Sequence, residues 1–268
     1  MRTGWVQAGA LGCALGVTPA QARITIIEIA SVDPFADGAE FGAARGDAAG
    51  GANPAGGTIG NAVALGISRS GRHLRDFIHR GLNRDAAGHR VFDGVLSHMA
   101  GIGGVFLNAR LGQPSRTNTQ HEDHLSPENA FPFSATAQHD PVTGRTGALL
   151  GNDGFDPLLI KVNTGTAYWP KGASLLTTDP LGLHARTLHD RAPAYLVWSA
   201  FHYGRAGLTS TRGPCAHRRS TLNPAPALRA LLIVLEEWVT EGRILPDSRI
   251  SRLSDGTLVE AAGTSSSG

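Results

Sequence analysis

The chain has 268 residues, of which 41% are hydrophobic and 17% are charged, a composition that supports a globular core and excludes an intrinsically disordered protein. The formal net charge is +2 with histidine neutral, so the sequence lacks the strong basic field that nucleic-acid-binding proteins use. We therefore expect a globular protein without a nucleic-acid partner.

The N-terminus has the pattern of a secretory signal peptide. Arg2 gives a positive start, residues 6–17 form a short apolar stretch, and residues 20–22 (Ala-Gln-Ala) have the small side chains of a cleavage site. The apolar stretch is too short to span a bilayer, and no later segment is expected to span one. We expect residues 1–22 to be a signal peptide cleaved after Ala22 and the mature protein to be periplasmic or secreted. The alternative is an ordinary hydrophobic N-terminus.

Residues 23–60 are expected to hold one strand and a linker. The sequence "RITIIEI" begins a β-rich run that stops at Pro34, and residues 36–57 are rich in glycine and alanine without any period. The folded domain is expected over residues 61–260, followed by a disordered tail over residues 261–268.

The elements that follow alternate between strands and helices. Short apolar runs that fit strands buried on both faces occur at 59–68, 91–101, 157–165 and 194–204. Helical spacing of apolar residues predicts helices over 70–83 and 226–242, with stop signals at Gly81, Asn83 and Gly242. Strands separated by helices predict an α/β fold with a largely parallel sheet.

A long, polar and irregular stretch runs from residue 103 to residue 154, which is typical of a functional lid or a binding loop. It contains "HEDH" at 121–124, which lacks the helical spacing of a His-Glu-x-x-His zinc site and is better interpreted as a polar loop. The glycine-rich region contains no phosphate-loop pattern. We therefore expect neither a metal nor a cofactor.

The most informative residues lie where the first predicted helix meets the strand before it. Here "GISRSG" has the pattern of a nucleophile elbow, a tight turn that lifts a serine hydroxyl above the sheet. The residues two before and two after the serine must be small, and here they are Gly66 and Ser70. The pattern makes Ser68 the candidate nucleophile and the amide of Arg69 a candidate oxyanion donor. The alternative is a helix that begins with a capping serine.

A serine nucleophile needs a base and an acid that orients the base, in the chain order serine, acid, histidine. His202 follows the last predicted strand, where the base is expected. No carboxylate directly follows the strand at 157–165, and the nearest one downstream is Asp179, the candidate acid. Tyr168 and Trp169 are candidates for lining an acyl pocket, with packing in the core as the alternative.

Several stretches are long enough to be compared with known families. They are "ALGISRSGRHLRDFIHRGLNRDAAGHRVFDGVL", "FPFSATAQHDPVTGRTGALL", "NTGTAYWPKGASLLTTDPLG", "YLVWSAFHYG" and "NPAPALRALLIVLEEWVTEG". These stretches resemble the alpha/beta hydrolase domain-containing proteins, a bacterial group of predicted serine esterases. The resemblance implies an α/β-hydrolase-like fold, hydrolysis of a small-molecule ester, and the roles of nucleophile and base for Ser68 and His202.

The chain departs from this family in two ways. The family usually has a glutamate, a plausible triad acid, where this chain has Ala167. Residues 42–59 are too few to hold the βαβ units of roughly 30 residues each that the fold places before the elbow. The N-terminal half of the sheet is therefore expected to be missing, as if an internal piece had been removed. The remaining sheet would expose an apolar edge through which copies of the chain could self-associate.

These patterns support a leading hypothesis and its alternatives. The leading hypothesis is a serine hydrolase that acts on carboxylic esters through an acyl-enzyme, with Ser68, His202 and the candidate acid Asp179 as its site. The alternatives are a catalytically impaired, truncated remnant of such an enzyme and a non-catalytic binding module.

Overall fold

The computed structural model describes residues 60–105, 129, 131–202 and 220–258. The chain divides into two units between Thr58 and Ile59, and all of the described residues belong to the second unit. The predicted signal peptide, the linker and the "HEDH" sequence lie outside the described residues.

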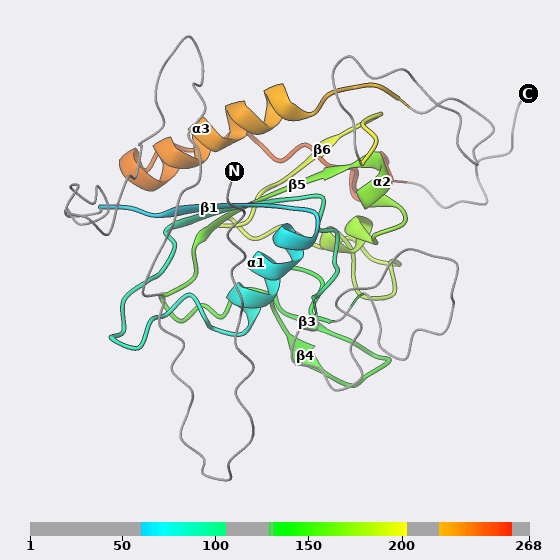
Figure 1. The fold of residues 1–268 in the computed structure, drawn as a ribbon. Coiled ribbons are helices and arrows are strands. Elements are labelled where there is room, and N and C mark those ends of the chain that lie inside the picture. Colours follow the sequence, from blue (N-terminus) through cyan, green and yellow to red (C-terminus); the bar gives the residue numbers. More distant parts are fainter. Residues whose placement is uncertain (1–59, 106–128, 130, 203–219, 259–268) are drawn as a thin grey trace, which may run out of the picture. The chain divides into compact units, whose positions relative to one another are not determined.

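Four parallel strands form the central sheet, as the alternation of strands and helices predicts. They are paired in the order β1 (Val63–Ile67), β2 (Gly94–His98), β5 (Leu158–Thr164) and β6 (Ala194–Val197) (Figure 1). Neighbouring strands that run parallel need crossover connections, and helices provide them on the faces of the sheet. The α/β architecture with a mostly parallel sheet is therefore confirmed.

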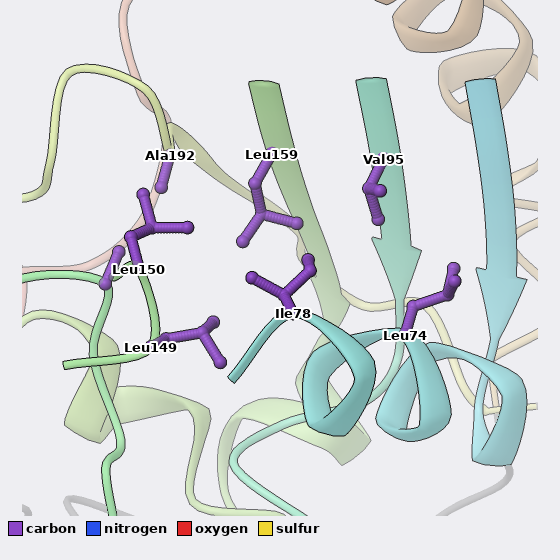
Figure 2. Close-up of a cluster of buried hydrophobic side chains, with 8 residues drawn as sticks. Leu74, Ile78, Val95, Leu149, Leu150, Leu159 and Ala192 are labelled. Carbon is purple, nitrogen blue, oxygen red and sulfur yellow. The ribbon is translucent and has the colours of Figure 1, made fainter. Parts of the chain in front are cut away.

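Helix α1 (Arg69–His79) covers one face of this sheet. Its Leu74 and Ile78 lie one turn apart and join Val95 of β2 and Leu159 of β5 in a buried cluster (Figure 2). The chain segments around this cluster add four more buried residues, Ala135, Leu149, Leu150 and Ala192. Full burial of each large apolar side chain contributes about 1.5–3 kcal/mol.

Helix α3 (Ala225–Glu241) covers the opposite face. Its Leu235 is fully buried and packs in one cluster with Leu96 of β2. Successive side chains of a strand point to opposite faces of the sheet, so Leu96 points away from the α1 side, which its neighbour Val95 faces. Gly94 permits this close approach, because a Cβ atom at that position would lie 2.8 Å from a methyl carbon of Val239. The sheet is thus covered by helices on both faces.

The ends of the two long helices agree with the predicted stop signals. The amide of Gly81 donates to the carbonyl of Ile78, and Gly81 has a φ of 69°. Gly242 follows α3 directly with the same φ of 69°. Both glycines adopt the left-handed conformation that commonly ends a helix.

The predicted irregular stretch contains more structure than its sequence indicates. An antiparallel pair, β3 (Gln138–His139) and β4 (Thr146–Gly147), lies within it. Leu149 and Leu150 from the same stretch are 1% and 2% exposed in the α1 cluster. The described end of this stretch therefore belongs to the core, and not to a polar lid.

Two short helices follow β5. Helix α2 (Gly165–Tyr168) and the 3-10 helix η2 (Ala173–Leu176) contribute fully buried side chains to a third cluster, which also includes Leu196 of β6. No helix among the described residues is long and apolar enough to cross a membrane.

Strand β1 is the outer strand of the described sheet and carries an exposed apolar strip. Val63, Leu65 and Ile67 are 37%, 48% and 46% exposed. Leu65 pairs with Leu96 of β2. Helix α3 packs on Leu96 but leaves Leu65 exposed, so this helix does not extend over β1. The expected apolar edge is therefore present among the described residues, and self-association through it stays a prediction.

Candidate active site

Ser68 occupies the turn between the last residue of β1 and the first residue of α1. Its backbone has φ 56° and ψ −112°, which is an unusual conformation for a residue with a side chain. The Ser68 amide donates to the carbonyl of His98 at the end of β2, with a distance of 2.7 Å between nitrogen and oxygen. The turn is therefore sharp, strained and tied to the neighbouring strand.

Small residues are needed around this turn because backbone and side-chain atoms approach it closely. A Cβ atom at Gly66 would lie 2.6 Å from the carbonyl oxygen of Ser70 and 2.7 Å from a methyl carbon of Leu74. Ser70 itself has an exposed side chain. The crowding thus involves the backbone of residue 70, which explains why serine is accepted where the strict motif has glycine.

The Ser68 hydroxyl contacts a histidine that follows β6, the strand at the opposite edge of the described sheet. Its Oγ lies 3.0 Å from Nε2 of His202, and the contact is partly buried. The same side chain makes no capping hydrogen bond to the start of α1. The geometry therefore differs from that of a helix-capping serine, and it joins the two residues that the sequence names as candidate nucleophile and base.

The surroundings of His202 favour its neutral form. Burial lowers the pKa of His202, and the positive charges of Lys171 and Arg72 lower this pKa further. A neutral imidazole can accept a proton at Nε2, whereas an imidazolium cannot. The site thus holds a histidine that stays unprotonated to a lower pH than an ordinary one.

His98 lies beside this pair and was not predicted from the sequence. It is 1% exposed, and its Nδ1 donates to the carbonyl of Val162 at 3.2 Å. Burial lowers the pKa of His98 to about 4, and the nearby His202 lowers it as well. Its position at the carboxyl end of a parallel strand is the signal that could have identified it, because functional groups gather at that edge of α/β sheets.

Arg69 is the first residue of α1, so its amide lies in the first turn, where the N–H groups point out of the N-terminal end of the helix. The first intrahelical bond runs from the amide of Arg72 to the carbonyl of Ser68. The start of α1 also carries the positive end of the helix dipole. A negative charge beside the Ser68 hydroxyl would be stabilised there.

Asp179 lies in a turn and binds groups close to it in the sequence. One carboxylate oxygen accepts from the amides of Leu183 and His184, and the other lies 2.7 Å from Nδ1 of His184. The structure thus brings Asp179 to His184. Its role as the triad acid stays a prediction. Ala167, at the family's glutamate position, is fully buried in α2.

The two aromatic candidates differ in their surroundings. Tyr168 is fully buried in the third core cluster, and its hydroxyl donates to the carbonyl of Ser251. Trp169 is 58% exposed, and its ring meets that of Tyr168 edge-on at 4.9 Å between centroids. Tyr168 therefore packs as a core residue, which is the alternative that the sequence leaves open.

The described residues contain no cluster of three or more histidine, cysteine, aspartate or glutamate side chains arranged to hold a metal ion. The described groups at the centre of the site are the Ser68 hydroxyl, the His202 imidazole and the backbone amides at the start of α1, with His98, Lys171 and Arg72 near them. Such groups can transfer a proton and stabilise an oxyanion, which is the chemistry of acyl transfer.

Comparison with known proteins gives one match. Residues 30–148 match a family model described as an alpha/beta hydrolase domain, and this range includes the elbow, α1 and β2. No curated protein and no solved structure gives a significant match. The matched region and the parallel sheet covered by helices on both faces agree with each other: the chain is similar to the alpha/beta hydrolase domain over residues 30–148, and its described residues have an α/β-hydrolase-like fold.

Proposed function

We propose that the protein is a serine hydrolase that cleaves carboxylic esters through an acyl-enzyme. The hydrolase domain supplies the general class of activity. The observation that carries the finer proposal is the distance of 3.0 Å between Ser68 Oγ and His202 Nε2. This distance lies within the range that lets a histidine remove a proton from a serine hydroxyl.

In the first half of the reaction, Ser68 Oγ forms a bond to the ester carbonyl carbon while His202 Nε2 takes the hydroxyl proton. The carbonyl oxygen becomes an oxyanion, and the Arg69 amide together with the positive end of the α1 dipole stabilises it. The C–O bond to the alcohol then breaks, and His202 returns the proton to the leaving alcohol. In the second half, water attacks the acyl carbon while His202 Nε2 takes one of its protons, the bond from that carbon to Ser68 Oγ breaks, and His202 returns the proton to Oγ as the acid leaves.

The proposed reaction does not depend on Asp179, because its carboxylate already binds His184 and the turn around it. The family position for the acid is occupied by Ala167. Removal of the acid from a complete triad costs on the order of 10⁴ in kcat. We therefore expect turnover that is slow compared with that of an enzyme with all three groups.

The alternative is a catalytically impaired remnant or a binding module. One specific observation favours it: the described charges that act on His202 are the cations Lys171 and Arg72, which oppose the imidazolium formed during catalysis. A carboxylate in their place would stabilise that imidazolium. The test must therefore distinguish an activated serine from a merely well-placed one.

The deciding experiment is covalent labelling of the purified mature chain with a fluorophosphonate, read by intact mass and peptide mapping. We expect one adduct at Ser68 in the folded chain and none in Ser68→Ala. Ser70→Ala is the matched control, because Ser70 has an exposed hydroxyl two residues away, and it should label like the wild type. Labelling that persists after heat denaturation, or its absence from a chain shown to be folded, would favour the remnant or the binding module.

We also propose that the protein is exported and that residues 1–22 are removed. The support is the charged start, the short apolar stretch and the Ala-Gln-Ala cleavage pattern. The intact mass of the protein recovered from the periplasm or the medium would test this, with cleavage after Ala22 as the expected result. A chain that keeps its N-terminus and stays with the cytoplasmic fraction would contradict the proposal.

A further inference from the structure

A small cavity lies under helix α1, at the face of the sheet that this helix covers. Its polar lining comes from Arg75 of α1, Ser97 of β2, and Lys161 and Asn163 of β5. Its volume is about 10 Å³, which is space for one group the size of a water molecule. The cavity is separate from the Ser68–His202 pair, and none of these four residues takes part in the proposed reaction.

Two cations line this cavity, and each has an unpartnered donor. Lys161 is 5% exposed, and its Nζ has no hydrogen-bond partner among the described residues. Arg75 is 6% exposed, and its Nε also lacks a described partner. The other two nitrogens of Arg75 are satisfied, because they donate to backbone carbonyls at residues 102, 103 and 132.

Burial of two like charges at one place is costly unless an opposite charge accompanies them. Burial lowers the pKa of Lys161 to about 7, and the charge of Arg75 lowers it further. Burial also lowers the pKa of Arg75 to about 10, against the opposing effect of Asp76. Asp76 therefore offsets part of the Arg75 charge, whereas no described carboxylate acts on Lys161.

The other described charges around these cations do not compensate them. His79 lies near Arg75, whose charge lowers the pKa of this histidine. A histidine is either neutral or positive, so His79 supplies no negative charge to balance the two cations. The Ser97 hydroxyl donates to the carbonyl of Gly71, and the side-chain oxygen of Asn163 accepts from the amide of Gly101. The cavity is therefore positive, and two of the cationic nitrogens of its lining residues have no described hydrogen-bond partner.

We propose that this cavity binds a single small monovalent anion, with chloride as the representative, between the side chains of Lys161 and Arg75. The anion would accept hydrogen bonds from both unused donors and provide the missing opposite charge. Chloride is larger than water, so the Lys161 side chain would shift to admit it. Because it would bind the protonated amine, the anion would also raise the pKa of Lys161.

The chain offers a direct test because Lys161 and Lys171 are its only lysines. Lysine labelled with ¹³C at Cε gives two signals in an NMR spectrum of the full folded protein. We expect the Lys161 signal to titrate near pH 7 in sodium gluconate, whose anion is too large for the cavity. Replacement of gluconate by chloride at equal ionic strength should raise this midpoint saturably, by about one pH unit at a tenfold excess over the dissociation constant.

Lys161→Met assigns the signal and gives the matched control for stability. In the wild type, chloride should raise the unfolding temperature at pH 8 relative to gluconate, and Lys161→Met should not respond to this exchange. If that variant does not fold, Lys171→Arg removes the other signal and assigns the spectrum. Equal effects of chloride and gluconate on the Lys161 midpoint would overturn the proposal. An ordinary lysine midpoint near 10.4 without halide would do the same, because the amine would then already have a counter-ion.

Discussion

Ser68 Oγ and His202 Nε2 lie 3.0 Å apart although 134 positions separate the two residues in the chain. β1 and β6 are the outer strands of the described sheet, with two strands between them, so they lie about 14 Å apart. His202 comes five positions after Val197, the last residue of β6, and five extended residues span about 17 Å. The short connection after β6, together with the length of the histidine side chain, therefore returns the imidazole to the serine.

The pH dependence of ester hydrolysis should reflect the surroundings of His202. The neutral imidazole is the active form, so activity should fall as the pH drops through the pKa of this residue. Because burial, Lys171 and Arg72 all lower that pKa, the acid limb of kcat/KM should lie below the ordinary value of about 6.5. Lys171→Met should move the limb toward higher pH, and an unchanged limb would contradict the assigned role of the lysine charge.

Gly66→Ala should destabilise the fold through the elbow. The added methyl group would meet the Ser70 carbonyl oxygen at 2.6 Å, and such overpacking costs about 1–3 kcal/mol. Gly60→Ala is the matched control, because a Cβ atom there has no neighbour within 4 Å. Urea unfolding of the two variants would measure the difference, and equal stabilities would argue against a crowded turn.

His98 should make the protein sensitive to acid. Its pKa is about 4 in the folded protein and about 6.5 in the unfolded chain, so the unfolded state binds more protons between these values. Stability should therefore fall as the pH drops from about 6.5 to about 4, by up to about 1.4 kcal/mol per pH unit for this one group. His98→Gln cannot titrate in this range. Urea unfolding across the range should give a flatter profile for it, whereas identical slopes would assign the acid sensitivity to other groups.

Leu235→Ala should measure how much the packing of α3 on the sheet contributes to the stability of the fold. Leu235 is fully buried between α3 and the sheet, and the loss of such a side chain costs about 2–5 kcal/mol. Ile233→Ala on the same helix is the control, because Ile233 is 40% exposed. Thermal unfolding should show a clearly larger loss for Leu235→Ala than for Ile233→Ala. A similar small loss in both would mean that α3 is only loosely attached.

The parts of the fold with strong local signals were predictable from the sequence. The strands are short apolar runs, and α1 and α3 repeat their apolar residues at helical spacing and end near glycines. The elbow could be identified as well, since its small residues and serine follow from the steric demands of one turn.

The rest depends on contacts between distant segments. Strands as short as β3 and β4 leave no periodic signal, and the burial of Leu149 and Leu150 arises only when α1 and the sheet come together. The contact between Asp179 and His184 could not be predicted from the sequence either. The choice between His184, five positions away, and His202 depends on the local turn, which chain order does not specify.

The strand order has a consequence for how the protein folds. The sheet runs β1-β2-β5-β6, which is also the order of these strands along the chain, so each strand pairs with the sheet strand that precedes it in the sequence, and the sheet can grow from its N-terminal side. The serine turn can form early, once β2 supplies the His98 carbonyl. The histidine follows β6, so a chain interrupted before residue 202 would carry the strained serine turn without the imidazole that contacts its hydroxyl.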